Sequence, residues 1–272
     1  MKMILNLPFA LAFILTAMVA EATSESRADG QAAPTERPRI NSEDERALED
    51  EMTEMNQDIQ SMRHEIHAVD QASPTSLSQA ERERRLDHAR ELLGKYYKKS
   101  VVRGGEHVKK VNGMIYRWTR KQLPKTFKKD SMKIAQTIID QSLKYEFDPI
   151  FLLAVISNES KFDPLIVGDV GEIGLMQIRP TTAKWITELK GIKYRGKSTL
   201  RDPVVNIKVG SAFLAFLREK FDSHARLYLA AYNMGQGNVR YALSKKIWPK
   251  DYAANVMQHY VGYYNELTQA DQ

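Results

Sequence analysis

The sequence lacks cysteine and has little glycine or proline. Its 272 residues include 14 glycines, 10 prolines and no cysteine. A chain without cysteine forms no disulfide and carries no lipid attached through a cysteine. The sequence also lacks any long alternation of apolar and polar residues, which a half-buried strand would need. We therefore predict an all-α fold, with at most a small hairpin near residues 168–177.

Long apolar runs are scarce as well, and the one at the N-terminus is short. Lys2 precedes the apolar run Ile4–Val19, and Ala20-Glu21-Ala22 offers a small-x-small cleavage site. These features are typical of a secretory signal peptide, whereas a permanent membrane span needs about 20 apolar residues. We predict that residues 1–22 are a signal peptide cleaved near Ala22, which makes the protein periplasmic or secreted. An uncleaved N-terminal anchor is the alternative.

Charge is distributed unevenly along the chain, whose formal net charge is +6. Residues 43–70 carry ten acidic and two basic residues, whereas residues 71–272 carry 34 basic and 20 acidic residues. A strongly basic body favours an anionic partner. Export disfavours nucleic acid, so we expect no nucleic acid partner. Peptidoglycan, whose stem peptides carry carboxylates, fits both the charge and the export signal.

The segment between the signal and the basic body divides into two parts. Residues 23–42 are polar and contain two prolines, which is typical of a disordered linker. Residues 43–70 carry apolar residues at heptad spacing, typical of a short coiled coil. This apolar seam consists of Leu48, Met52, Met55, Ile59, Met62, Ile66 and Val69. We expect it to contact a protein partner or a second copy of the chain, or to lie as an amphipathic helix on its own chain.

A second helix is expected over residues 77–99, after a break at Ser73-Pro74-Thr75. The two helices would form an antiparallel hairpin, so residues 43–99 are predicted to be a helical arm. Arg103-Gly104-Gly105 marks the boundary after it. Residues 100–272 are predicted to be the catalytic domain.

Two Asp-Pro pairs mark helix starts in that domain. Asp148-Pro149 and Asp202-Pro203 each supply a capping side chain and a proline for the first helical position. The helix after the first pair, Ile150–Glu159, is apolar almost all round and should be buried. Further helices are expected over residues 132–145, 180–190, 206–221, 225–232 and 251–267.

Glu159 ends that apolar helix. Apolar surroundings desolvate the ionised form of a carboxylic acid, which raises its pKa. A carboxylic acid that stays protonated near neutral pH can protonate a glycosidic oxygen. Taken alone, a helix-end glutamate that simply reaches water is the commoner case. Glu159 is therefore a candidate general acid that needs support from other residues.

Two later segments supply that support. The first, Gly171–Gln177, has glycines that allow a tight backbone path and close approach of a ligand. Its Gln177 can both donate and accept, which suits a sugar acetamide. The second, Ala230–Gly237, places Tyr232 and Asn233 at a helix end before glycines. Each segment alone would be only a turn.

Together and in this order, these motifs resemble the lytic transglycosylase SLT domain, which shares a helical, lysozyme-like fold with goose-type lysozymes. The resemblance runs from about Ile134 to about Tyr264. Glu159-Ser160 is similar to the catalytic Glu-Ser motif of that family. Gly174-Leu175-Met176-Gln177 and Ala231-Tyr232-Asn233 match two further family motifs without change.

The resemblance implies roles for seven residues and needs no metal or cofactor. Glu159 would be the single catalytic acid and base, and Ser160 would hydrogen-bond it. The other residues would bind the glycan: Gln177 and Asn233 its N-acetyl groups, Met176 the underside of a sugar, and Tyr232 and Tyr252 the cleft. The match around Tyr252 departs from the family pattern, because Pro249-Lys250-Asp251 stands where the family often has Glu-Thr.

The resemblance also implies the reaction. The family cleaves the β-1,4 bond between N-acetylmuramic acid and N-acetylglucosamine and forms 1,6-anhydromuramic ends without consuming water. Two alternatives remain open from the residues alone. A lysozyme-like hydrolase would need a second carboxylate, for which Asp163, Asp169, Glu172 and Glu188 are candidates by sequence. A non-catalytic protein that binds or assembles cell wall is the other.

Overall fold

The computed structural model describes residues 79–104 and 108–269, together with five positions nearer the N-terminus. The chain divides into two units, Met1–Asn56 and Gln57–Gln272. The expected signal peptide, the linker and the apolar seam lie outside the described residues. No helix among the described residues is long and apolar enough to cross a bilayer. The five separate positions, all helical and exposed, are Arg46, Asp50, Thr53, Gln57 and Gln60.

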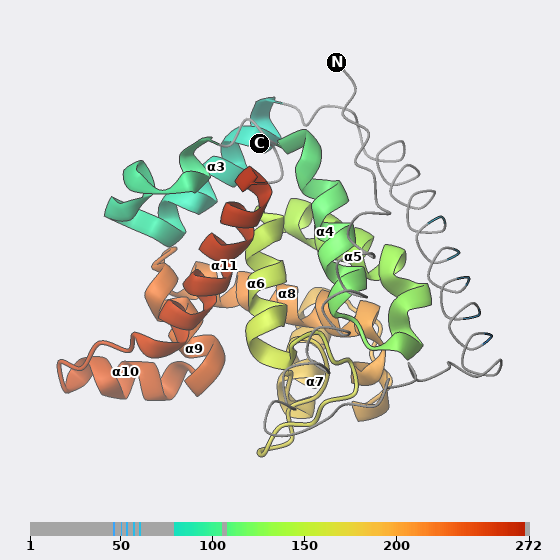
Figure 1. Ribbon diagram of the computed structural model, residues 1–272. Helices are drawn as coiled ribbons and strands as arrows, with labels where there is room; N and C mark the ends of the chain where they lie inside the picture. Colours follow the sequence, from blue (N-terminus) through green and yellow to red (C-terminus); the bar gives the residue numbers. More distant parts are fainter. Residues whose placement is uncertain are drawn as a thin grey trace, which may run out of the picture. The chain divides into compact units, whose positions relative to one another are not determined.

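Helices build the described part of the second unit (Figure 1). The α-helices are α3 (Gln79–Leu93), α4 (Val108–Gln122), α5 (Ser131–Lys144), α6 (Pro149–Ser160), α7 (Pro180–Lys190), α8 (Pro203–Lys220), α9 (Ala225–Met234), α10 (Gln236–Ser244) and α11 (Asp251–Gln269). The 3-10 helices are η1 (Gly94–Lys99), η2 (Val101–Gly104), η3 (Lys125–Asp130) and η4 (Lys197–Arg201).

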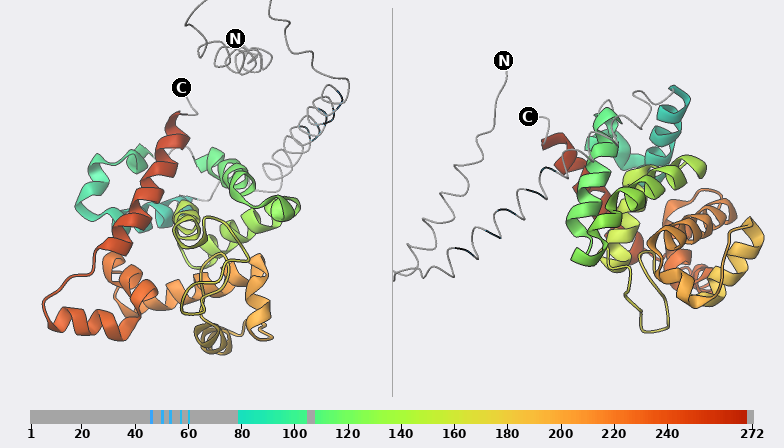
Figure 2. Two further views of the ribbon diagram at one scale, coloured as in Figure 1. Left: turned by 60° about the horizontal axis from the view of Figure 1, so that its bottom comes forward. Right: turned by 90° about the vertical axis from the view of Figure 1, so that its right-hand side faces the viewer.

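The all-α prediction is confirmed. Residues 79–104 and 108–269 contain no strand. The expected hairpin region holds two isolated antiparallel bridges, which join Ile173 to Val167 and to Ile178. A long loop between α6 and α7, residues 161–179, contains these bridges and extends beyond the C-terminal end of α6 (Figure 2).

The helix α6 lies at the centre of this unit, as its apolar sequence predicts. Every residue from 150 to 156 is fully buried, and α4, α5 and α11 pack around the helix (Figure 1). Its first turn is capped by Asp148, whose Oδ1 accepts from the backbone N–H of Ile150 at 2.9 Å. Burying a large aliphatic side chain is worth about 1.5–3 kcal/mol. The packing therefore makes α6 a rigid support for Glu159 at its other end.

The second helix of the expected arm, α3, packs on this unit. In α3, His88 is fully buried, and its Nδ1 accepts from the backbone N–H of Asp148 at 3.0 Å. Glu91 forms an ion pair with Arg218 of α8, with 2.6 Å between the closest atoms. The helix ends early because Gly94 adopts φ +51° and the chain continues as 3-10 turns. Residues 79–104 thus belong to the same compact unit as residues 108–269.

The sequence patterns did not predict two of these helices, α4 and α10. Helix α4 is amphipathic, and its apolar residues Val111, Met114, Ile115 and Trp118 are buried at helical spacing. Apolar residues at that spacing indicate an amphipathic helix. Helix α10 is short and starts directly after Gly235, whose φ of +85° separates it from α9. Its start therefore depends on a backbone turn that hydrophobic periodicity does not report.

Candidate active site

The candidate catalytic residue, Glu159, lies in the last turn of α6. The helix stops one residue later because Lys161 and Phe162 adopt left-handed conformations, with φ of +50° and +64°. Left-handed conformations are costly for non-glycine residues and persist only where the surroundings impose them. Here the fully buried Phe162 side chain anchors the turn. The chain therefore leaves α6 sharply, and the Glu159 side chain is left at the edge of a hollow.

The loop after α6 is clamped by Asn206 of α8. Asn206 is fully buried, and its Oδ1 accepts from the backbone N–H of Met176 at 2.7 Å. Its Nδ2 donates to the carbonyls of Ile173 at 2.7 Å and Leu200 at 2.9 Å. Gly174 has φ +79°, and an added Cβ would lie 2.5 Å from Nδ2 of Asn206. Only glycine fits there, which explains why the Gly-Leu-Met-Gln motif begins with glycine.

The Met176 side chain lies outside the lining of the hollow. It is fully buried. It packs against Gly210 of α8, where an added Cβ would lie 2.5 Å from the sulfur. The backbone carbonyl of Met176 accepts a hydrogen bond from the Tyr232 hydroxyl at 2.7 Å. Met176 therefore joins the loop to α8 and α9 and does not reach the hollow.

Ser160 contacts backbone carbonyls at the C-terminal end of α6. Its hydroxyl is buried and lies 2.9 Å from the carbonyl of Leu175 and 3.2 Å from that of Ile156. A serine hydroxyl has a single proton to donate, and both acceptors are backbone carbonyls rather than the Glu159 carboxylate. Ser160 thus ties the end of α6 to the Gly-Leu-Met-Gln loop, which positions Glu159 indirectly.

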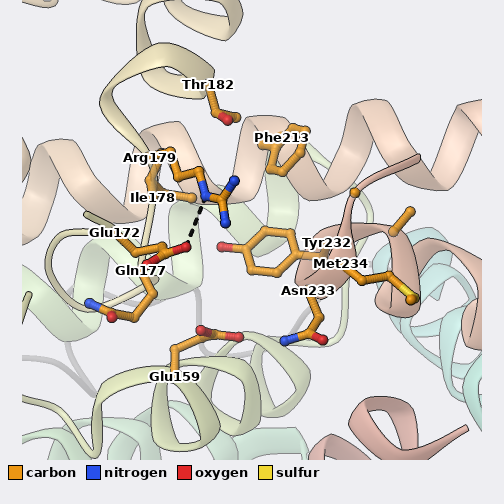
Figure 3. A pocket seen from close by; sticks show the side chains of 12 residues that line it. Glu159, Glu172, Gln177, Ile178, Arg179, Thr182, Phe213, Tyr232, Asn233 and Met234 are labelled. Atoms are coloured by element: carbon orange, nitrogen blue, oxygen red, sulfur yellow. Dashed lines mark hydrogen bonds and ion pairs between the residues drawn. The ribbon is translucent and has the colours of Figure 1, made fainter. Parts of the chain in front are cut away.

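Four of the seven expected residues meet around one pocket of about 310 Å³, here called the acid pocket. Glu159 and Gln177 lie on one side, and Tyr232 and Asn233 of α9 lie on the other (Figure 3). Figure 3 also shows the Asn233 amide directed toward the Glu159 carboxylate. The sequence therefore identified residues from three distant segments that the fold brings together.

Gln177 lines the acid pocket, but its amide is engaged by the loop itself. Its Nε2 donates to the carbonyls of Gly174 at 3.0 Å and Ile166 at 3.3 Å. The backbone at Gln177 is left-handed, with φ +44°. These contacts hold the amide in place, so a ligand in the pocket meets an oriented group rather than a mobile side chain.

Tyr252 contacts Glu159 from α11. Its hydroxyl donates a hydrogen bond to Oε1 of Glu159. The Tyr252 ring stacks on Tyr232, with centroids 6.5 Å apart, and Tyr232 in turn contacts Phe213 of α8. Tyr252 therefore contacts the candidate acid directly, although the sequence just before it departs from the family pattern.

Burial raises the pKa of Glu159 from its ordinary value to about 7. The hydrogen bond from Tyr252 favours the ionised form and opposes this rise, whereas the nearby negative charge of Glu172 adds to it. The position at the C-terminal end of α6 acts in the same direction as burial, because the helix dipole disfavours an anion there. Glu159 is therefore poised to give up and take back a proton near neutral pH.

Two charged residues of the acid pocket were not selected from the sequence as a pair. Glu172 Oε1 accepts from Nε of Arg179 at 2.9 Å (Figure 3). Burial alone would raise the pKa of Glu172, but its bonds with Arg179 and with backbone N–H groups hold that pKa below the ordinary value. Both residues lie in the loop between α6 and α7, which has no periodicity to indicate which side chains meet.

Among residues 79–104 and 108–269, no group of three or more histidine, aspartate or glutamate side chains comes together in a way that could hold a metal ion. The chemistry available at the acid pocket is that of a carboxylic acid, amides, phenols and one guanidinium.

Comparison with known proteins identifies the segment that carries this pocket. The sequence model of the transglycosylase SLT domain matches residues 136–265, which contain every candidate residue. This segment is similar to SLT domains. It begins inside α5 and ends inside α11, and α3 and α4 precede it and pack on it.

The relatives of this segment are longer proteins. The chain is 36% identical over 91 residues to the soluble lytic murein transglycosylase of Salmonella typhimurium, covering 33% of this chain and 14% of that protein. It is 31% identical over 164 residues to the membrane-bound lytic murein transglycosylase C of Cronobacter sakazakii, covering 54% and 43%. The chain thus spans less than half the length of either relative.

One solved structure aligns with part of the chain. The lytic transglycosylase Slt of Pseudomonas aeruginosa, in an inactive mutant form, aligns with 68% of this chain and 37% of its own, with 23% identity and a TM-score of 0.46. At this level the likeness carries no detail of the site. The positions of the site residues described above come from this chain alone.

Proposed function

We propose that this protein is a peptidoglycan lytic transglycosylase in which Glu159 acts first as acid and then as base. The observation that carries the proposal is a single carboxylic acid with a pKa raised to about 7, directed into a pocket lined by Gln177, Tyr232 and Asn233. The SLT domain match over the same residues supports the choice of substrate. The basic charge of residues 71–272 fits the anionic stem peptides.

In the first step, protonated Glu159 donates its proton to the oxygen of the β-1,4 bond between N-acetylmuramic acid and N-acetylglucosamine. The bond between C1 and that oxygen breaks, and positive charge develops at C1 of the muramic sugar. The Tyr252 hydroxyl supports the carboxylate that this step creates, because it already donates to Oε1. The amides of Gln177, which the loop orients, and of Asn233 hold the N-acetyl groups of the strand.

In the second step, the 6-hydroxyl of the same muramic sugar attacks C1 and its proton passes to ionised Glu159. The product is a 1,6-anhydro ring, and Glu159 is protonated again for the next turnover. No water is consumed. A hydroxyl held next to C1 within the same molecule replaces water by proximity. A pKa near 7 suits both proton transfers, since it lies close to the working pH.

Lysozyme-like hydrolysis is the second candidate, and Glu172 is the observation that favours it. This carboxylate lines the same pocket as Glu159 and has a lowered pKa, as a second carboxylate of a hydrolase would. We favour hydrolysis less than the transglycosylase reaction because one carboxylate oxygen of Glu172 already accepts a hydrogen bond from Arg179. In the transglycosylase reading, Glu172 acts on Glu159 through its charge.

Product analysis in ¹⁸O-labelled water separates the two candidates. Purified peptidoglycan is digested and the released fragments are examined by mass spectrometry. We expect 1,6-anhydromuramic ends that carry no ¹⁸O. Reducing ends that carry ¹⁸O as the main product would establish hydrolysis instead. A folded protein that cleaves no peptidoglycan would reject both reactions and favour a non-catalytic protein that binds cell wall.

We further propose that the protein works outside the cytoplasm, after cleavage of residues 1–22. The apolar run at the N-terminus and the cell-wall substrate support this location. The seam within residues 43–70 would contact a protein partner or a second copy. N-terminal sequencing of the secreted protein tests the cleavage, and light scattering with and without residues 43–70 tests the self-association.

A further inference from the structure

Two basic segments that are far apart in the sequence meet at a second hollow, of about 780 Å³. Residues 94–104 and residues 240–250 each contain four lysine or arginine residues and no acidic residue. Each segment contributes one lysine and one aromatic residue to the lining of the hollow: Lys95 and Tyr96 from the first, Lys250 and Trp248 from the second. We call the two segments together the basic surface.

Large apolar and aromatic side chains are exposed within the basic surface. Four of them are each more than half exposed: Tyr96, Tyr241, Ile247 and Trp248. Trp248 is the most exposed of the three tryptophans in the chain, at 56%. Ile247 and Trp248 directly follow two lysines in the irregular loop between α10 and α11. Exposed apolar side chains that lie together mark an interaction site.

Lysine ammonium groups lie beside the two exposed tyrosine rings. Nζ of Lys95 lies 5.2 Å from the ring centroid of Tyr96, and Nζ of Lys245 lies 5.7 Å from that of Tyr241. Tyrosine and tryptophan rings favour the interface between a membrane and water. Lysine stems lie along apolar surface in the same region while their ammonium groups stay in the polar layer. Lysines paired with aromatic side chains are therefore typical of a surface that meets a bilayer.

The acidic residues near the hollow do not offset its positive charge. Glu91 lines the hollow, but it forms an ion pair with Arg218 and its side chain is 11% exposed. Asp222 in the lining and Asp251 next to Lys250 are exposed, whereas the basic surface carries eight exposed basic residues, four in each segment. The exposed charge around the hollow is therefore positive, and it attracts an anionic surface.

The loop between α6 and α7 also exposes apolar side chains, but among charges of the opposite sign. Leu165, Val167 and Val170 are exposed there. Residues 162–175 contain three acidic residues and no basic residue, so an anionic surface repels this loop. The feature that distinguishes the basic surface is therefore the combination of exposed apolar side chains with lysines.

We propose that the basic surface binds an anionic lipid bilayer, with Ile247 and Trp248 inserted at the headgroup level and the lysines paired with lipid phosphates. A bilayer of anionic lipid presents negative charge above an apolar layer, and the basic surface presents lysines around apolar side chains. A soluble polyanion would attract the lysines but leave Ile247 and Trp248 in water. These two side chains therefore favour the bilayer over an acidic protein or polymer. The inference goes beyond the proposed function and does not depend on the reaction at Glu159.

Vesicle binding with matched lysine variants tests the electrostatic part. The protein is used from residue 23, its secreted form under the proposed cleavage, because the apolar run Ile4–Val19 would itself insert into lipid. We expect it to sediment with vesicles that contain phosphatidylglycerol and not with vesicles of phosphatidylcholine alone. Replacing three lysines of the basic surface should lower the partition coefficient about tenfold at about 0.1 M salt. These changes are Lys245→Gln, Lys246→Gln and Lys250→Gln.

The control for this variant has the same net charge. It combines Lys184→Gln, Lys190→Gln and Lys193→Gln, which change exposed lysines in or just after α7 that do not line the hollow. We expect its partition coefficient to stay within about twofold of the wild type, because salt screens exposed charges that do not meet the lipid closely. Equal losses in the two variants would show binding through the overall charge of the chain and would overturn the proposal.

The insertion of apolar side chains is tested separately. Ile247→Ser combined with Trp248→Ser should weaken vesicle binding about tenfold, whereas Leu189→Ser, which removes an exposed aliphatic side chain from α7, should change it by less than about twofold. Vesicles with bromine-labelled acyl chains should quench the tryptophan fluorescence of the wild type but not that of the Trp248→Phe variant. Quenching that persists in Trp248→Phe would overturn the proposed insertion.

Folding and activity are measured alongside lipid binding. A melting temperature equal to that of the wild type shows that a variant is folded. A wild-type protein that fails to bind phosphatidylglycerol vesicles would overturn the proposal, and binding to polyglutamate in their place would indicate a soluble acidic partner. The Glu159→Gln variant should bind vesicles as the wild type does. Failure of lipid binding and failure of the proposed reaction are therefore observed separately.

Discussion

The two ends of α6 carry two carboxylates that serve different purposes. Asp148 caps the first turn and Glu159 lies in the last, and each accepts a hydrogen bond from tyrosine hydroxyls of α11. Asp148 accepts from Ile150, Tyr260 and Tyr264 and is fully enclosed. Glu159 has a bond from Tyr252 and opens on the acid pocket.

The difference between the ends explains why one carboxylate is structural and the other is suited to chemistry. Burial raises the pKa of Asp148 as it does that of Glu159, but Tyr264, Arg85 and Tyr260 all oppose the rise at Asp148. The positive end of the helix dipole also favours an anion at Asp148 and disfavours one at Glu159. A carboxylate with several donors and no access to ligand holds a fold together. A carboxylate with few donors and an open pocket can exchange protons.

The largest effect should come from removing the acid. Glu159→Gln keeps the shape of the side chain but cannot transfer a proton, so we expect cleavage to fall by about 10³-fold or more. Melting temperature measured in parallel should stay at or above the wild-type value. Substantial turnover by a folded Glu159→Gln protein would reject Glu159 as the acid.

The opposite end of the helix should respond in stability. Asp148→Ala removes the cap of α6 and the acceptor of two buried tyrosine hydroxyls, so we expect a loss of about 3–5 kcal/mol in the free energy of unfolding. Asp202→Ala is the matched control, because Asp202 caps α8 in the same way but is exposed. It should cost about 1 kcal/mol. Similar losses in urea titrations of the two variants would show that the buried tyrosine contacts contribute little.

The raised pKa of Glu159 also predicts that the free energy of unfolding depends on pH. Between its ordinary value of 4.5 and about 7, the unfolded chain ionises this group while the folded chain keeps it protonated, so stability falls as pH rises through that window. The full shift corresponds to at most about 3 kcal/mol, and we expect about 1–2 kcal/mol because the pocket admits water.

Glu159→Gln should therefore match the wild type in urea unfolding near pH 4.5 and exceed it at pH 8. The control is Asp140→Asn, which removes an exposed carboxyl of α5 and leaves the acid pocket unchanged. That control should show no such rise. A Glu159→Gln advantage that is independent of pH would contradict a raised pKa.

The smallest predicted effects are two shifts in the pH profile, and they have opposite signs. Tyr252→Phe removes a bond that favours ionised Glu159, so its pKa should rise. Glu172→Gln removes a negative charge that disfavours the ionised form, so the pKa should fall. Cleavage needs protonated Glu159 first, so the alkaline limb of kcat/KM should move up for Tyr252→Phe and down for Glu172→Gln, each by about half a pH unit. Shifts of both profiles in the same direction would contradict the opposite effects of Tyr252 and Glu172 on the pKa of Glu159.

The sequence predicted best where local chemistry decides structure. Asp148-Pro149 and Asp202-Pro203 start helices as expected, because a cap and a proline act on their own turn. The apolar run before Glu159 is the buried α6, because a helix that is apolar all round is stable only inside a core. The all-α class followed from the lack of strand alternation, and the meeting of Glu159, Gln177, Tyr232 and Asn233 followed from the motifs.

The sequence predicted less where a contact depends on which neighbour fills a space. The structure places Gly210 against the Met176 side chain and the Leu175 carbonyl against the Ser160 hydroxyl, contacts that no motif indicates. The pairing of Glu172 with Arg179 depends on the path of an irregular loop, which hydrophobic periodicity does not describe. The burial of His88 in α3 has no apolar signal in the sequence either.

The most direct test of the contrast between the two ends of α6 is the titration of the Glu159 carboxyl itself. The protein is labelled with ¹³C at glutamate side-chain carboxyls, and the Glu159 resonance is assigned by its absence from Glu159→Gln. Its chemical shift is then followed with pH. We predict a titration midpoint at about pH 7, well above the ordinary value of 4.5. A midpoint near 4.5 would contradict a protonated Glu159 at neutral pH and the acid role that depends on it.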